Sequence, residues 1–177
     1  MDDLDLNPLL VQADPGENLR YCKYKHINEV PDTLDEKIWS EIKDKIKTDS
    51  ESKFNYEIEN TSRSVGTRLS HHIYKKFGNN KLKENTVQIK LEGSAGQSLG
   101  AFLTKGVKLT VEGDCNDYVG KGLSGGTIVV YPSSKSSLVS NENTIIGNTV
   151  LYGATSGKLF ASGQAGERFA VRNSGSF

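Results

Sequence analysis

Residues 93–132 read GSAGQSLGAFLTKGVKLTVEGDCNDYVGKGLSGGTIVVYP, in which short apolar runs alternate with glycines. Glycine recurs along this stretch at intervals of 20 residues, as in Gly93 and Gly113 or Gly100 and Gly120. Fifteen of the 18 glycines of the chain lie from residue 93 onward, so the recurrence belongs to this half. A fixed period of this length is typical of stacked units, each of which buries its apolar face against its neighbours.

Strands rather than helices are expected in each unit. A unit of 20 residues is too short for a helical hairpin repeat, and these residues are poor helix formers. Residues 87–91 (VQIKL) and 107–111 (VKLTV) alternate between apolar and polar side chains, as strands with one buried face do. The period therefore predicts an all-β fold, a parallel β-helix in which successive units pair strand to strand.

Glycine at matching positions of successive units predicts corners, where the chain needs a positive φ or a close backbone approach. We expect residues 87–177 to form the β-helix, and residues 1–86 to form an α-helical and irregular extension that packs on it. The glycines predicted to have this structural role are Gly93, Gly96, Gly100, Gly113, Gly120, Gly122, Gly126, Gly153, Gly157, Gly163 and Gly166.

The extension opens with an irregular leader, residues 1–31, in which prolines are predicted to break any helix. These breakers are Pro8, Pro15-Gly16 and Pro31. Asp32 or Thr33 is then expected to cap a helix whose apolar residues recur at every fourth position. The apolar stripe consists of Leu34, Ile38, Ile42 and Ile46.

The rest of the extension predicts a strand and a second helix. Residues 54–59 alternate as a strand does, and a helix is expected to begin within residues 61–64. Its apolar face would contain Val65, Leu69, Ile73 and Phe77, with Gly78 as the C-cap. Within the second half of the chain, residues 132–144 predict a loop between units.

Composition narrows the classes of partner. The formal net charge is zero, so nucleic acid and acidic membranes are not predicted as partners. No apolar run approaches the ~18 residues of a membrane span, and the acidic start is unlike a signal peptide. Cys22 and Cys115 lie in no metal-binding spacing, which favours a reduced compartment. We therefore expect an intracellular, cytoplasmic location, with an organelle left open.

Two catalytic motifs occur within the glycine-rich half. Residues 120–125 match GxGxxG, the dinucleotide fingerprint, which requires a helix immediately after it. Residues 122–126 match GxSxG, in which Ser124 would be a nucleophile with a histidine later in the chain. A strand-like sequence follows both motifs, and the last histidine is His72. Structural glycine is the favoured interpretation, so neither cofactor-binding nor catalytic residues are predicted.

Three other groups have weak functional interpretations. His71 and His72 would point about 100° apart on a helix, so a metal site is not predicted. Asp114 and Asp117 raise the hypothesis of a carbohydrate-active site, but capping of a corner by Asp114 is favoured. Arg168 and Arg172 are interpreted as partners of carboxylates on a neighbouring unit or domain rather than as an anion site.

Four segments of the sequence resemble a known family. They are GSAGQSLGAFL (93–103), EGDCNDYVGKGLSGGTIVVYP (112–132), IIGNTVLYGATSGKLFASGQAGERFAVRNSG (145–175) and NTxRSVG (60–66), in which Ser62 stands where the family usually has Asp. The chain resembles the C-terminal domain of the glutamate synthase large subunit, over nearly its whole length and including the leader, residues 4–15. The resemblance implies a right-handed parallel β-helix. Because that family continues past RNSG, it also implies that this β-helix is truncated at its C-terminal end.

The resemblance implies a function through the parent enzyme. That enzyme transfers the amide nitrogen of glutamine to 2-oxoglutarate, using a cysteine amidotransferase domain, FMN on a barrel, an iron–sulfur cluster, and NAD(P)H or ferredoxin. None of these groups is expected in this chain. It would act as a scaffold between the amidotransferase and FMN-barrel domains, with the small subunit as a further partner. Candidate interdomain contacts are Arg63, Arg168 and Arg172.

Two alternatives belong to other classes. The first is a stand-alone β-helix subunit of another oxidoreductase, similar to the β-helical component of formylmethanofuran dehydrogenase. Residues 60–66 and the leader argue against it, because they belong to the synthase resemblance. The second is a carbohydrate-active β-helix, which would depend on Asp114 and Asp117.

Overall fold

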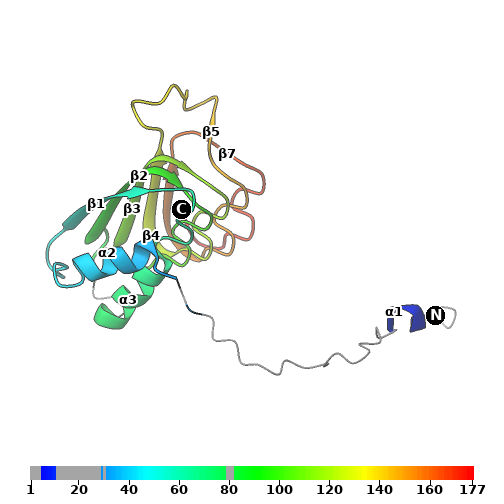
Figure 1. Ribbon diagram of the computed structural model, residues 1–177, viewed down its shortest axis with the longest axis horizontal. Helices are drawn as coiled ribbons and strands as arrows, with labels where there is room; N and C mark the ends of the chain where they lie inside the picture. The colour runs from blue at the N-terminus through cyan, green and yellow to red at the C-terminus, as the bar shows by residue number, and fades with distance from the viewer. Residues whose placement is uncertain (1–4, 11–28, 30, 79–81) are drawn as a thin grey trace. The chain divides into compact units, whose positions relative to one another are not determined.

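The computed structural model describes residues 5–10, 29, 31–78 and 82–177 (Figure 1). The chain forms two compact units, Met1–Pro31 and Asp32–Phe177, and each is described by itself. In the first unit, α1 (Asn7–Leu10) is a single helical turn. Pro8 lies inside this turn, so the prediction that it breaks any helix is wrong; the first turn of a helix needs no backbone N–H from it. The prediction for Pro15-Gly16 lies outside the described residues.

The second unit begins with α2 (Leu34–Ile42). Thr33 is its N-cap, as predicted, and the Thr33 side chain accepts a hydrogen bond from the backbone N–H of Glu36 at 3.4 Å. The predicted stripe is longer than the helix, which ends four residues before Ile46. Ile46 is nevertheless buried, so the apolar stripe continues beyond the helical backbone.

The second helix, α3 (Thr67–Phe77), starts later than predicted. Gly66 is its N-cap and Gly78 its C-cap, and the latter agrees with the prediction. A start within residues 61–64 is wrong because Ser64 and Gly66 are left-handed, with φ of 54° and 102°. A right-handed helix cannot pass through such residues. The turn that precedes α3 is therefore separate from the helix.

Seven strands form one sheet, in which all the pairings between named strands are parallel. Five strands lie in the order β1-β2-β3-β4-β6, and β5 pairs with β3 and β7. The strands are β1 (Ser52–Ile58), β2 (Val87–Ala95), β3 (Val107–Cys115), β4 (Ser124–Tyr131), β5 (Thr144–Ile146), β6 (Ser156–Ala161) and β7 (Gln164–Ala165). The strand predicted over residues 54–59 corresponds to β1, and the predicted loop over residues 132–144 to the connection from β4 to β5.

Strand register follows the sequence period. In β2 and β3, Gly93 pairs with Gly113, a step of 20 residues. The step from Ile128 in β4 to its partner Leu159 in β6 is 31 residues, because the loop over residues 132–143 intervenes. This loop extends from the end of the sheet at which β4 finishes, at the top of Figure 1. The apolar alternation therefore gives the correct pairing of the central strands.

The prediction of an all-β fold, a right-handed parallel β-helix, is wrong. The structure is an α/β fold, in which one open parallel sheet has a helix, α3, between β1 and β2 and does not close. The physical reason is that only one part of each unit is extended. Residues 98–103 and 118–123, which follow β2 and β3, form turns and not further strands. The division of the chain at residue 86 stays a prediction.

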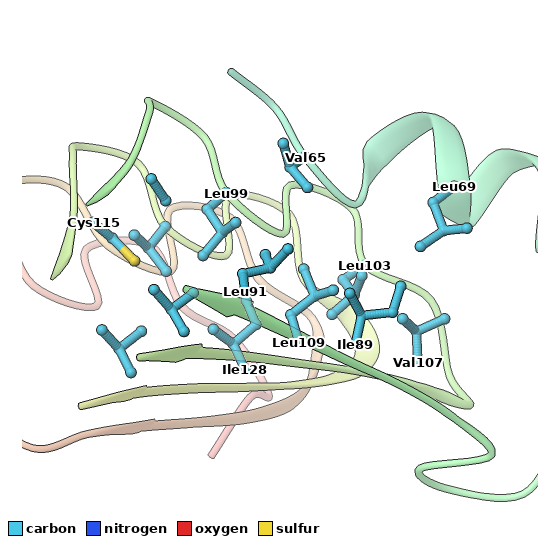
Figure 2. Packing of buried hydrophobic residues seen from close by; sticks show 14 of the residues in the cluster. Val65, Leu69, Ile89, Leu91, Leu99, Leu103, Val107, Leu109, Cys115 and Ile128 are labelled. Carbon is cyan, nitrogen blue, oxygen red and sulfur yellow. The ribbon is translucent and has the colours of Figure 1, made fainter. Parts of the chain in front are cut away.

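The core of the second unit is aliphatic. Leu69 of α3, Ile89 of β2 and Leu109 of β3 are completely buried in one cluster, together with Leu99 and Leu103 from the turns (Figure 2). Ile38 and Ile42 of α2 belong to the same cluster. The sheet, the turns and both helices therefore share one core. Among the described residues, no helix is both long and apolar enough to cross a membrane.

Candidate functional site

The glycines of the strands lie where neighbouring backbones approach most closely. Gly93 pairs with Ile58 on one side and with Gly113 on the other. A Cβ atom on Gly93 would collide with the carbonyl oxygen of Ile58, and one on Gly113 would collide with that of Gly93. Both residues also have positive φ, 129° and 153°. This glycine column therefore lets three strands approach without side chains between their backbones.

The turns beside the sheet have their own repeating backbone. Three alternate residues in each turn are left-handed: Ser98, Gly100 and Phe102, then Tyr118, Gly120 and Gly122, then Thr149, Leu151 and Gly153, then Arg168, Ala170 and Arg172. The N–H of Gly120 donates to the carbonyl of Leu99 at 2.9 Å, and that of Leu151 to Val119 at 2.8 Å. Stacked turns are thus hydrogen-bonded to one another, and glycine is not required at every left-handed position.

The other predicted glycines pack against neighbouring segments, with one exception. A Cβ on eight of them would meet a residue of another segment within 4 Å. These pairs are Gly96 with Asn60, Gly100 with Ile128, Gly120 with Leu151, Gly122 with Phe102, Gly126 with Leu103, Gly157 with Gly126, Gly163 with Ile145 and Gly166 with Asn148. Gly153 has open space around it, so only its φ of 65° constrains the residue type.

The residues that match the two glycine motifs lead directly into a strand. β4 begins at Ser124, so no helix follows the GxGxxG match to bind a pyrophosphate at its N-terminus. The hydroxyl of Ser124 donates to the carbonyl of Gly122 at 2.8 Å. His71 and Ser124 nevertheless line one surface hollow of about 380 Å³. The sequence did not predict this proximity, because the GxSxG pattern requires a histidine after the serine and His71 precedes it.

Asp35 is the most constrained polar residue of the helical layer, and sequence reasoning missed it. It lies in the first turn of α2, is 3% exposed, and reaches the start of α3. Its carboxylate accepts hydrogen bonds from the backbone N–H groups of Gly66 at 2.7 Å, Arg68 at 2.9 Å and Leu69 at 3.3 Å. Gly66 offers no side-chain cap, so Asp35 caps α3 from another helix.

The ionisation of Asp35 reflects opposing effects. Burial raises the pKa of Asp35 above its ordinary value, although the three backbone N–H groups act in the other direction. The neighbouring Glu36 lies nearer the surface and accepts from His72 at 3.0 Å and from Arg68 at 2.7 Å. The hydrogen bond from His72 is the main reason that the pKa of Glu36 is lowered.

His71 and His72 belong to this surface network, and His26 lies outside the described residues. The His72 ring stacks on Trp39 of α2, with ring centroids 5.0 Å apart, and it meets His71 edge to face. Among the residues that the structure describes, no group of three or more histidine, cysteine or carboxylate side chains could hold a metal ion. Cys115 is buried, and burial raises its thiol pKa; Cys22 lies outside the described residues.

A row of carboxylates crosses three neighbouring strands. Glu57, Glu92 and Glu112 occupy matching register positions on β1, β2 and β3. Lys90 lies between two of them, with its Nζ atom 2.9 Å from Glu92 and 2.7 Å from Glu112. Hydrogen bonds from Lys90 and then Ser133 lower the pKa of Glu112. The row borders a groove of about 480 Å³ beside the loop over residues 132–138.

Asp114 and Asp117 have different surroundings. Asp114 lies within β3 and lines the groove beside the carboxylate row. Asp117 lies in the following turn, where its carboxylate accepts from the backbone N–H of Asn148 at 2.7 Å. Asp117, rather than Asp114, therefore makes the capping hydrogen bond predicted for this corner. The structure does not place the two carboxylates together on the groove.

The three arginines predicted as interdomain contacts are all exposed. Arg63 precedes α3, whereas Arg168 and Arg172 lie in the last of the stacked turns. None of the ion pairs formed among the described residues includes them. Pairing of Arg168 or Arg172 with a carboxylate of a neighbouring unit is therefore not observed in this part of the chain.

Comparisons with a family model and with individual known proteins agree on one family. A model described as "GXGXG motif" matches residues 35–177. The NADPH glutamate synthase large chain of Azospirillum brasilense is 61% identical, over 99% of this chain and 12% of that protein. The NADH glutamate synthase of Saccharomyces cerevisiae is 47% identical, over 98% and 8%. Ferredoxin-dependent glutamate synthase 2 of Synechocystis is 44% identical, over 97% and 11%. This chain therefore spans about a tenth of the length of these relatives.

Proposed function

The chain belongs to the GXGXG motif family and corresponds to the GXGXG domain of glutamate synthase large chains, and we propose that it is a scaffold in such an enzyme. The enzyme would transfer the amide nitrogen of glutamine to 2-oxoglutarate and form glutamate. In this proposal the chain contributes no catalytic residue. It holds other domains in the geometry that nitrogen transfer needs. The comparisons give no support to the formylmethanofuran dehydrogenase alternative.

One observation carries this proposal. Relatives named for three different electron donors, NADPH, NADH and ferredoxin, share 44–61% identity with this chain over 97–99% of its length. A domain that recognised the electron donor would have to differ among them. The shared role is therefore one that every glutamate synthase needs, whichever donor supplies its electrons.

The backbone arrangement supports a rigid role. β2 and β3 pair over nine successive residues, and the turns beside them are hydrogen-bonded from one unit to the next. Because the contacts of the glycine column are between backbones, a relative movement of these strands would break many hydrogen bonds at once. A rigid stack of this kind keeps the surfaces that it connects in fixed relative positions.

Partners and cofactors follow from the proposed enzyme. The amidotransferase and FMN-barrel domains would contact this chain, and the small subunit would be a further partner where one exists. FMN, an iron–sulfur cluster and NAD(P)H or ferredoxin would be bound by those other parts. Exposed Arg63, Arg168 and Arg172 are the proposed polar contacts to them. A cytoplasmic location is proposed with the enzyme.

The test is to reverse the charge of these arginines in the full-length enzyme. We expect Arg168→Glu with Arg172→Glu to lower the glutamate formed per glutamine hydrolysed, because domain alignment is disturbed while each catalytic centre is intact. Glutamine hydrolysis and FMN reduction should each stay near their unaltered rates. Lys53→Glu, at an exposed position on β1, is the matched control. Glutamate formation by the isolated 177-residue chain would refute the scaffold role.

A further inference from the structure

A hollow of about 370 Å³ lies where β4 and β6 begin. Among the described residues that line it, none has an apolar side chain. Two glycines and Glu84 contribute to the lining, together with two lysines, Lys105 and Lys158, and three residues with hydroxyl groups, Ser124, Thr127 and Ser156. We call it the lysine hollow. Pockets for drug-sized ligands are lined mainly by apolar and aromatic residues, so a fully polar lining favours a small, charged ligand.

Thr127 of β4 has a hydroxyl without a protein partner. Its side chain lies on the face of the sheet opposite the core, because the next residue, Ile128, points into the core. Thr127 is nevertheless only 8% exposed, and its hydroxyl makes no hydrogen bond within the part of the chain that the structure describes. The oxygen is not sealed inside the protein, since in that part only Asn85 Oδ1 is both fully enclosed and unpaired. It therefore faces the lysine hollow, where a ligand can accept its hydrogen bond.

Strand register places a lysine on each side of Thr127. Thr127 pairs with Lys108 of β3 and with Lys158 of β6. Side chains of paired residues leave a parallel sheet on the same face, so both lysines extend beside the threonine. Lys105, in the turn before β3, lines the hollow as a third lysine. Three separate segments of the chain therefore supply positive charge around one hydroxyl.

One carboxylate balances only part of this charge. Lys158 pairs with Glu84 at 2.7 Å, whereas Lys105 and Lys108 make none of the ion pairs formed among the described residues. The hydrogen bond and charge of Lys158, and to a smaller extent the charge of Lys105, lower the pKa of Glu84. Both lysines thus act on the same small region, and the excess positive charge favours an anion.

The donors indicate which kind of anion fits. Among the described residues no arginine lines the lysine hollow, and the planar guanidinium is the group that best matches a planar carboxylate. Lysine ammonium groups act as point charges, and together with a hydroxyl they suit the oxygens of a tetrahedral phosphate.

We propose that the lysine hollow binds a phosphate group, either free phosphate or the end of a small phosphomonoester. The Thr127 hydroxyl donates to one phosphate oxygen, and Lys105, Lys108 and Lys158 neutralise the charge of the phosphate. The site goes beyond the scaffold role and does not depend on it, because the scaffold would hold other domains in place whether or not the hollow is filled.

Competitive acetylation of lysines in the full-length enzyme tests the site. Each lysine is quantified by peptide mass spectrometry after brief acetylation with or without inorganic phosphate, at constant ionic strength. Phosphate should slow the acetylation of Lys105 and Lys158 severalfold, and succinate at the same concentration should not. Lys53 is the matched control, because it is also an ion-paired lysine on a strand. Glycerol 3-phosphate then distinguishes the two sources, and either result supports the site: stronger protection than by phosphate indicates a phosphomonoester, and weaker protection indicates free phosphate.

Two substitutions should change the affinity in opposite directions. Thr127→Val keeps the shape of the side chain but removes the hydroxyl, so the phosphate concentration that gives half-protection should rise about tenfold. Glu84→Gln removes the carboxylate that competes for Lys158, so this concentration should fall severalfold. Poor folding of a variant would not produce such a fall.

Several results would overturn the phosphate site. These are equal protection by succinate, equal protection of Lys53, and no protection of Lys105 and Lys158. An unchanged phosphate dependence in both Thr127→Val and Glu84→Gln would show adventitious binding and would also overturn the proposal. None of these measurements depends on glutamate formation, so a negative result here leaves the scaffold role intact.

Discussion

Removal of the Asp35 carboxylate should destabilise the helical layer more than any surface substitution near it. In Asp35→Ala, three backbone N–H groups at the start of α3 lose their acceptor. The hydrogen bonds to Gly66 and Leu69 are buried, and a buried donor without a partner costs about 1–3 kcal/mol. The N–H of Arg68 is only partly buried, so water can replace the lost acceptor there. We expect a loss of about 3 kcal/mol in the free energy of unfolding.

Urea denaturation of the 177-residue chain measures this loss. Trp39, the only tryptophan, stacks on His72 across the two helices, so its fluorescence reports the packing that Asp35 supports. At about 2–4 °C per kcal/mol for a unit of this size, the melting temperature should fall by about 6–12 °C.

Glu36→Ala is the matched control for Asp35→Ala, because Glu36 is the next residue and its ion pair lies near the surface. It should cost less than about 1 kcal/mol. If Asp35→Ala destabilised the chain no more than Glu36→Ala does, the capping of α3 by Asp35 would not contribute to stability and the reasoning would be wrong.

Three further predictions follow from other features. Gly113→Ala should lower the midpoint of urea denaturation by several times the shift of Gly153→Ala, because both have positive φ but only Gly113 faces a carbonyl oxygen; equal shifts would show that φ alone matters. Burial raises the folded-state pKa of Asp35 above 3.8, so the native state holds this proton more tightly and the group's contribution to stability falls as pH rises through that folded pKa. The stability of the unaltered chain relative to Asp35→Asn, measured between pH 7 and pH 4, should therefore increase on acidification, and a decrease would contradict the direction of the pKa shift. Cys115 should be alkylated at least a hundredfold more slowly in the native chain than in urea, as peptide mass spectrometry would show, because its buried thiol has a raised pKa; comparable rates would contradict its burial.

The sequence predicted the strand pairing because alternation of side chains is a local property. Val87–Leu91 and Val107–Val111 carry the same pattern, and they pair residue by residue in the structure. The same locality gave Thr33 and Gly78 as helix caps, since caps depend on neighbouring residues. These elements follow from interactions within a few residues along the chain.

The β-helix prediction failed for a reason visible in the turns. Glycine indicates a corner but not what lies between corners, and left-handed positions here also hold Leu151 and Ala170. Because residues other than glycine also occupy left-handed positions, the spacing of the glycines does not distinguish a turn from a strand. Asp35 was missed because its partner Gly66 lies 31 residues away, and no local pattern connects a helix to the cap that another helix provides.

The number of residues between paired positions differs from one pair of neighbouring strands to another, and this difference shows where the domain can change in length. From Thr127 to Val130, β4 keeps a constant 31-residue step to its partners in β6, because residues 132–143 hold the extra length outside the sheet. The register shifts only before this stretch, between Ser124 and Thr127. One residue added within β3 would instead turn the following side chains of that strand to its opposite face. Residues 134–139 are exposed and lie on the side of the sheet where β4 ends. This loop is therefore the position at which evolution or an engineer can insert a reporter domain or a new binding segment while the stacked units keep their register.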